Sequence, residues 1–298
     1  MPSFPRSPII AALVLLGVLL ASCGGSDANP DDNRFISSNS DAPFLPVLVS
    51  SNTSTNADRL VLTLLEGNRA PNFPLDTTFT VRYLDAIENG FRFRDQAAAT
   101  MIETADGVFY TAPVSFDRTG FWAIEVVATL PDGETISSAR LPIEINTRDA
   151  TPIPGDAAPA SPTLTLRDGP LTQISSAFNP TPALYETALN EALDAGQPFV
   201  VVFSTVGYCF GSTLCQRAVD QVARLSAQTG VLGIHSEPLT VDDGVTPIPS
   251  EAGVLSDWSL QNDPWIFVVD ATGTISASFE LVVSDDELLA ALQAVVPR

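Results

Sequence analysis

The chain has 298 residues, of which 45% are hydrophobic, and this length and composition are enough for two domains with their own cores. The formal net charge is −21, and every basic residue is Arg. Nucleic-acid binding needs clustered cations, and the sequence has no basic stripe, so we expect no nucleic-acid partner. The acidic balance bears on solubility and not on the fold.

The N-terminal segment has the pattern of an export signal. Arg6 precedes an apolar run over residues 9–21, which suits a signal sequence and is short for a transmembrane helix of roughly 20 residues. The run ends in LASC at 20–23, followed by two glycines. This pattern resembles the lipobox of bacterial lipoproteins, which implies a signal peptide over 1–22 and a lipid on Cys23. We therefore expect a membrane partner through lipidated Cys23 and a place in the cell envelope, on the extracytoplasmic side.

An ordinary secretory signal, cut nearby with Cys23 incidental, stays open as the alternative. Residues 23–42 are rich in Ser, Asp, Asn and Gly and have few apolar side chains. Such a segment cannot bury enough apolar surface to order itself, so we interpret it as a flexible tether.

Residues 43–147 have the short, period-two apolar runs of β-strands. A PDG turn signal lies at 131–133. Several strands without helical periodicity predict an all-β, immunoglobulin-like sandwich, in which we find no catalytic constellation. The predicted strands cover 60–65, 79–83, 108–111, 120–128 and 141–145. A Pro- and Ala-rich stretch follows, which we interpret as a semi-rigid linker over 148–162.

Residues 163–298 alternate helix and strand signals, which predicts an α/β domain. The run FVVVF at 199–203 is typical of a central strand buried on both faces. Ser284 and Glu287 have capping-box spacing at the start of a last helix. The other predicted elements are helices at 182–195 and 216–229 and strands at 231–235, 265–270 and 274–281.

This order of elements, with GQPFVVVF at 196–203 and PWIFVVD at 264–270, resembles the extracytoplasmic thioredoxin-like proteins. The resemblance covers 183–296 and implies a thioredoxin-like fold with thiol–disulfide exchange. It also implies that Pro264 is cis and faces the redox cysteines. The residues that it assigns are Cys209, Cys215 and Pro264 for catalysis and Tyr208, Asp263 and Trp265 for binding of a client protein.

The cysteine spacing departs from that family, because five residues separate Cys209 from Cys215 where thioredoxins have two. Which sulfur attacks is therefore open. Two interpretations of the pair remain: it cycles between dithiol and disulfide with thiol or disulfide client proteins, or it is a permanent staple in a binding or scaffold protein.

His235 is the single histidine of the chain and is expected to be structural, at the end of a strand. Two cysteines and one distant histidine fall short of a closed zinc shell, so we expect no metal and no cofactor. Delivery of a metal such as copper is the weakest of the three functional hypotheses.

Overall fold

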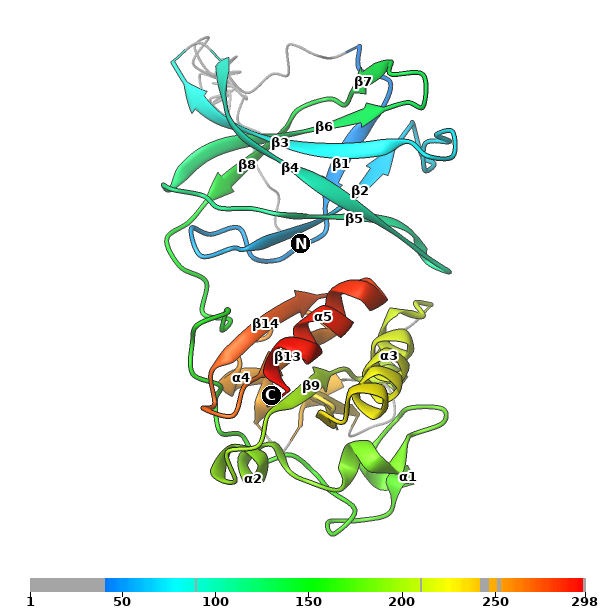
Figure 1. Ribbon diagram of the computed structural model, residues 1–298, viewed down its shortest axis with the longest axis vertical. Coiled ribbons are helices and arrows are strands. Elements are labelled where there is room, and N and C mark those ends of the chain that lie inside the picture. The colour runs from blue at the N-terminus through cyan, green and yellow to red at the C-terminus, as the bar shows by residue number, and fades with distance from the viewer. Residues whose placement is uncertain (1–40, 89, 210, 242–246, 251–252, 297–298) are drawn as a thin grey trace, which may run out of the picture.

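The computed structural model describes residues 41–88, 90–209, 211–241, 247–250 and 253–296 (Figure 1). The predicted signal peptide and Cys23 lie outside the described residues. Within these ranges no helix is both long enough and apolar enough to cross a membrane. An eight-stranded sheet forms the N-terminal half, and a four-stranded sheet with helices forms the C-terminal half.

The N-terminal strands form one continuous antiparallel sheet, which curls around its core (Figure 1). The long strand β4 makes it continuous, because its first part pairs with β3 and its last part pairs with β5. The sheet order is β1-β2-β5-β4-β3-β6-β7, and β8 pairs with β6. The strands are β1 (Leu45–Leu48), β2 (Arg59–Leu65), β3 (Thr78–Ile87), β4 (Gly90–Thr104), β5 (Gly107–Pro113), β6 (Gly120–Thr129), β7 (Thr135–Ser137) and β8 (Leu141–Ile145).

The five strands predicted from period-two patterns are all present, as β2, β3, β5, β6 and β8. Alternate residues of these strands, among them Leu62, Val81 and Ile124, fill one apolar core. The strands β1, β4 and β7 were not predicted. Most side chains of β4 are exposed, so this strand has no apolar alternation to reveal it.

The C-terminal sheet has the order β10-β9-β13-β14, in which β9 and β10 are parallel and the other pairs antiparallel. Its strands are β9 (Phe199–Phe203), β10 (Leu232–Ser236), β13 (Trp265–Val269) and β14 (Ile275–Glu280), with a separate hairpin of β11 (Leu239–Val241) and β12 (Pro247–Pro249). The helices are α1 (Leu171–Ile174), η2 (Pro182–Tyr185), α2 (Leu189–Asp194), η3 (Val206–Tyr208), α3 (Leu214–Thr229), α4 (Val254–Asp257) and α5 (Asp285–Val295).

Strand β9 is buried on both faces, as its apolar run predicts. Val200 and Val202 pack with α3 and α5, whereas Phe199, Val201 and Phe203 pack with α2 and α4 on the other face. Helix α5 begins at the predicted cap, where the Glu287 N–H donates to Ser284 Oγ at 3.2 Å. The loop that joins β9 to α3 carries Cys209, and the first turn of α3 carries Cys215.

The single helix predicted over 182–195 is wrong. The structure has the short helix η2, an extended residue Ala188 and then α2. Two hydrogen bonds to side chains account for the break: the Ala188 N–H donates to Glu191 Oε2 at 3.2 Å, and the Leu189 N–H donates to the distant Thr163 Oγ1 at 3.0 Å. These donors are the ones that a continuous helix would use, so a new helix starts there.

The segment interpreted as a linker lies against the C-terminal sheet. The Gly155 N–H donates to Ile275 O, the Ala158 N–H donates to Gly273 O, and Ser161 is fully buried. The two halves also contact each other directly. Val61, Ile102 and Phe109 from the N-terminal sheet form an apolar cluster with Val282, and Arg59 donates to Val282 O at 2.8 Å.

Candidate functional site

Cys209 and Cys215 form a disulfide with their Cα atoms 6.2 Å apart. Cys209 follows helix η3 in the loop after β9, and Cys215 is the second residue of α3. The two sulfurs differ in exposure: Cys215 is 0% exposed and belongs to the core under α3, whereas Cys209 is only partly buried. An external thiol therefore reaches Cys209 first.

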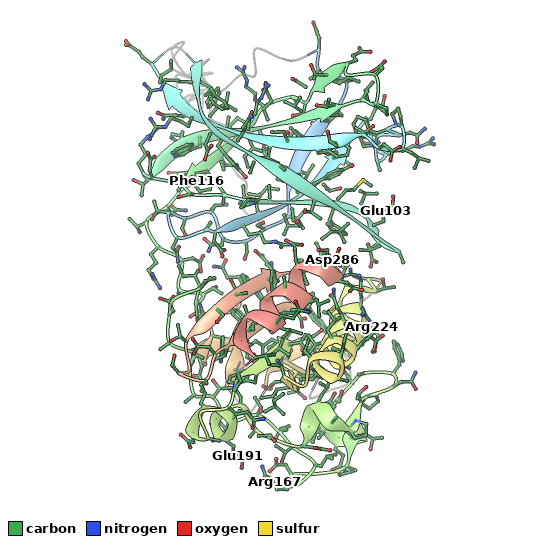
Figure 2. All side chains as sticks on the ribbon, in the orientation of Figure 1. Glu103, Phe116, Arg167, Glu191, Arg224 and Asp286 are labelled. Carbon is green, nitrogen blue, oxygen red and sulfur yellow. A yellow bond between two sulfur atoms is a disulfide. The ribbon has the colours of Figure 1, made fainter. Side chains whose placement is uncertain are left out.

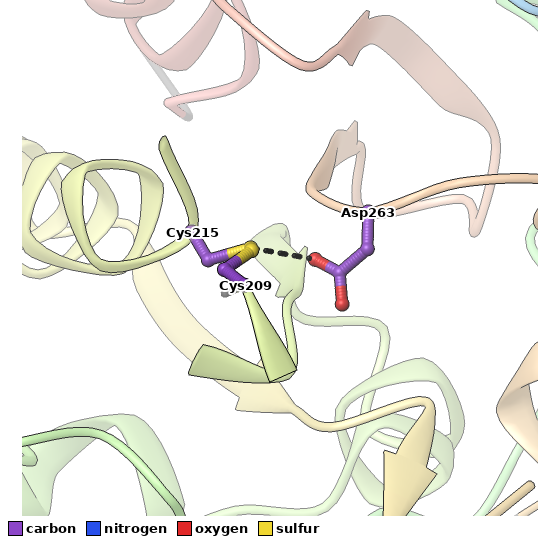
Figure 3. A group of neighbouring side chains, drawn as sticks. All are labelled: Cys209, Cys215 and Asp263. Carbon is purple, nitrogen blue, oxygen red and sulfur yellow. Dashed lines mark hydrogen bonds between the residues drawn. A yellow bond between two sulfur atoms is a disulfide. The ribbon is translucent and has the colours of Figure 1, made fainter. Parts of the chain in front are cut away.

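Asp263 lies directly beside the disulfide (Figure 3). Its peptide bond to Pro264 is cis, and Cys215 Sγ is 3.4 Å from Asp263 Oδ1. The other carboxyl oxygen accepts the Thr205 N–H at 2.6 Å. Since Thr205 comes just after β9 and Asp263 just before β13, the two adjacent strands hold the carboxyl group in place.

Burial raises the pKa of Asp263 to about 6, and the hydrogen bonds from Thr205 and Ser204 only partly oppose this shift. In the disulfide neither sulfur carries a proton. Once the bond is reduced, the Cys215 thiol can donate to the Asp263 carboxylate 3.4 Å away. A carboxyl group with a pKa near 6 suits proton transfer at neutral pH.

Cys209 opens onto a groove of about 850 Å³. Phe178, with 84% of its surface exposed, lines the groove together with Gln216 and Arg217 of α3. Phe178 is held by its own N–H, which donates to Gln216 Oε1 at 3.2 Å. An exposed aromatic side chain beside an accessible sulfur provides a surface for an extended peptide.

The other residues assigned from the sequence lie in different places. Tyr208 closes helix η3 next to Cys209 and is partly buried. Trp265 is 5% exposed and stacks on Phe267 in the core, so its side chain does not reach the groove. Asp263 was assigned to client binding from the sequence, but its side chain contacts a sulfur of the disulfide.

His235 is enclosed between Tyr185 and Ser204. Its Nδ1 lies 2.5 Å from Tyr185 Oη, and its Nε2 lies 2.7 Å from Ser204 O. A carbonyl oxygen only accepts, so Nε2 carries a proton and donates it to Ser204 O. Burial lowers the pKa of His235 to about 4. With both ring nitrogens engaged, His235 is not available as a metal ligand to the cysteines.

The donor atoms that could hold a metal ion after reduction are those of Cys209, Cys215 and Asp263, which lie within 4.8 Å of one another. Two thiolates and one carboxylate make an open, three-ligand set. The sequence missed this third donor because Asp263 lies 48 residues after Cys215 and no spacing rule joins them. Thr205 was missed for the same reason.

No protein-family model matches the chain, and no curated protein matches it. Among solved structures, a thio-disulfide isomerase from Thermus thermophilus is 19% identical with a TM-score of 0.31, over 49% of this chain and 98% of the other. A human fibronectin type-III domain is 16% identical with a TM-score of 0.24, over 37% and 89%. A purple acid phosphatase from yellow lupin is 16% identical with a TM-score of 0.25, over 39% and 21%. At these TM-scores the similarities do not assign the chain to a family.

Proposed function

We propose that this protein is a lipid-anchored, extracytoplasmic thiol–disulfide exchange protein in which Cys209 is the sulfur that meets the client. The observation that carries the proposal is the asymmetry of the pair. Cys209 is partly exposed at a groove, and Cys215 is fully buried 3.4 Å from the Asp263 carboxyl group. A disulfide with one accessible and one enclosed sulfur can form a mixed disulfide and then resolve it internally.

In the oxidising direction, a client thiolate attacks Cys209 Sγ and the Cys209–Cys215 bond breaks, with Cys215 leaving as the thiolate. A second client thiolate attacks the client sulfur of the mixed disulfide and releases Cys209. The client loses two electrons and the pair gains two. In the reducing direction, the Cys209 thiolate attacks the client disulfide, and one client sulfur leaves as a thiolate. Cys215 then gives its proton to the Asp263 carboxylate and attacks Cys209 Sγ, which breaks the mixed disulfide and releases the second client thiolate. The client gains two electrons and the pair loses two.

The domain assignments belong to the same proposal. We assign 43–147 to an immunoglobulin-like module and 163–298 to a thioredoxin-like domain, with a signal peptide over 1–22, a tether over 23–42 and a linker over 148–162. The order of strands and helices after residue 196 supports the second assignment. Lipidation of Cys23 is supported by the sequence pattern alone.

Trapping tests the assignment of the two sulfurs. In Cys215→Ser, Cys209 should form a stable mixed disulfide with an exported protein or with glutathione, because no internal thiol remains to resolve it. The matched variant Cys209→Ser should form at least tenfold less adduct, because Cys215 is buried. Peptide mass spectrometry distinguishes these adducts from any at Cys23. Equal trapping by both variants, or none through Cys209, contradicts the proposal.

A structural disulfide in a binding or scaffold protein is the second candidate. The burial of Cys215 in the core under α3 favours it, since a bridge there ties the loop to the helix. Redox titration separates the two candidates. Structural bridges in exported proteins have potentials below about −300 mV, whereas exchange-active ones lie higher. Resistance of the folded protein to millimolar dithiothreitol favours the scaffold.

A further inference from the structure

The N-cap residue of the helix that carries Cys215 does not itself cap the helix. Thr213 makes no side-chain capping hydrogen bond within α3, although the Leu214 N–H donates to Ser212 Oγ at 3.2 Å. Free N–H groups at a helix N-terminus carry partial positive charge and favour an anion. Because Cys215 is in the first turn, a charged group at this end of α3 also affects the pKa of the Cys215 thiol.

The missing partner comes from the other half of the molecule. Asp106, in the turn between β4 and β5, accepts the Thr213 N–H at 2.9 Å and the Thr213 hydroxyl at 2.7 Å. In Figure 2 the end of β4, marked by Glu103, points toward the side of the C-terminal domain that bears Arg224 of α3 and Asp286 of α5. The residue after Thr213, Leu214, packs against the apolar cluster between the two halves.

Two consecutive residues before Cys215 are thus held by the N-terminal sheet, one by a carboxylate and one by apolar contact. The carboxylate has a second effect. The positive end of the helix would stabilise a Cys215 thiolate, but the Asp106 carboxylate already occupies that end. The carboxylate therefore disfavours the reduced, ionised form of the pair.

We infer that Asp106 is a positioning residue for the disulfide, through which the N-terminal domain shifts the dithiol–disulfide equilibrium toward the disulfide. The inference rests on the proposed exchange function, because only a pair that cycles has an equilibrium to shift. It gives the N-terminal sheet a role in the chemistry of the disulfide, through the turn that carries Asp106.

Equilibration of the full chain with glutathione redox buffers at pH 7 tests the inference, with the oxidised fraction read by differential alkylation and peptide mass spectrometry. Asp106→Asn keeps a hydrogen-bond acceptor and removes the charge. A charge at a helix end is worth a few tenths to 1 kcal/mol, so we expect a shift of about two- to fivefold toward the dithiol. That shift corresponds to a potential about 9–21 mV more positive, since tenfold equals 29.6 mV.

The matched control is Asp132→Asn, which removes the same charge from another turn of the same sheet, where Asp132 accepts the Glu134 N–H. We expect its equilibrium to equal that of the unmodified chain. An unmodified chain that equilibrates, with Asp106→Asn equal to Asp132→Asn, overturns the inference alone. An unmodified chain that is not reduced at all overturns the proposed function.

Discussion

Glu125 in the N-terminal sheet and Asp263 in the C-terminal domain are both carboxyl groups withdrawn from water, but their partners differ. Glu125 is held by two guanidinium groups, with Arg82 at 3.2 Å and Arg140 at 3.3 Å. Asp263 receives hydrogen bonds from an amide and hydroxyls, and among the residues that the structure describes no arginine forms a salt bridge with it.

The same contrast extends to the neighbours of each group. Asp85 in the N-terminal sheet is 3% exposed and forms ion pairs with Arg92 and Arg118. In the C-terminal domain burial raises the pKa of Glu237 and lowers that of His235. A paired buried charge supports the fold, whereas an unpaired one with a displaced pKa is more typical of a reactive site. The contrast therefore favours a reactive site on the side of the molecule that carries the disulfide.

The largest expected effect on stability comes from His235. Its folded pKa of about 4 lies below its ordinary value of 6.5, so the unfolded chain binds the extra proton between these values. The contribution of His235 to stability is complete above pH 6.5 and is lost as the pH falls toward 4, by on the order of 3 kcal/mol. Urea unfolding of the unmodified chain and of His235→Gln isolates this contribution, because the difference between their free energies of unfolding should shrink by that amount over the same pH range.

The chain has one histidine, so its imidazole resonances are assigned without ambiguity and NMR can titrate them directly. The variant His235→Gln supplies the blank spectrum. A midpoint near 6.5 would show that burial does not lower the pKa of His235. It would weaken the comparison between the two halves.

The next effect is on the rate of exchange. Asp263→Asn removes the acceptor for the Cys215 proton, and loss of a general base costs typically about 10²-fold or more, so we expect a 10²-fold slower resolution at pH 7. The measurement is the plateau rate of oxidation of the reduced protein at saturating oxidised glutathione. In the unmodified chain this rate should fall as the pH drops below about 6, where Asp263 becomes protonated.

The control for this rate is Glu237→Gln. Glu237 is a nearby carboxyl group whose pKa burial also raises, but it accepts from Ser175 and Ser176 and does not contact a sulfur. Equal slowing in both variants would indicate a general electrostatic effect and would remove the assignment of Asp263 as the proton acceptor.

The smallest effects are opposite changes in stability at pH 8. Asp263 has a folded pKa of about 6 against an ordinary value of 3.8, so its contribution to stability falls as the pH rises through that window. Asp263→Asn removes this penalty and should raise the free energy of unfolding by about 1–3 kcal/mol. Glu125→Gln breaks two ion pairs with partly exposed arginines and should lower it by about 1 kcal/mol. If urea unfolding shows that both variants change the free energy of unfolding in the same direction, the contrast between the two carboxyl groups is wrong.

Local patterns determined much of the architecture. The alternation along β2 and β6, the uniformly apolar run of β9 and the cap formed by Ser284 and Glu287 all depend on residues close in sequence. Such features are encoded by period and by turn chemistry, which a single chain displays without a partner. Strand β4 and the break before α2 could not be predicted from the sequence, because their formation depends on partners elsewhere in the fold.

The residue patterns along the chain predicted an all-β half, an α/β half and a pair of cysteines at the junction between a buried strand and a helix. The folded structure was needed to show that Cys209 is accessible and Cys215 enclosed, that Asp263 lies against the inner sulfur, and that Asp106 caps the helix that carries it. Distance along the chain explains the difference. Each of these contacts joins segments at least 48 residues apart, and their positions follow from strand pairing and from the packing of the two halves.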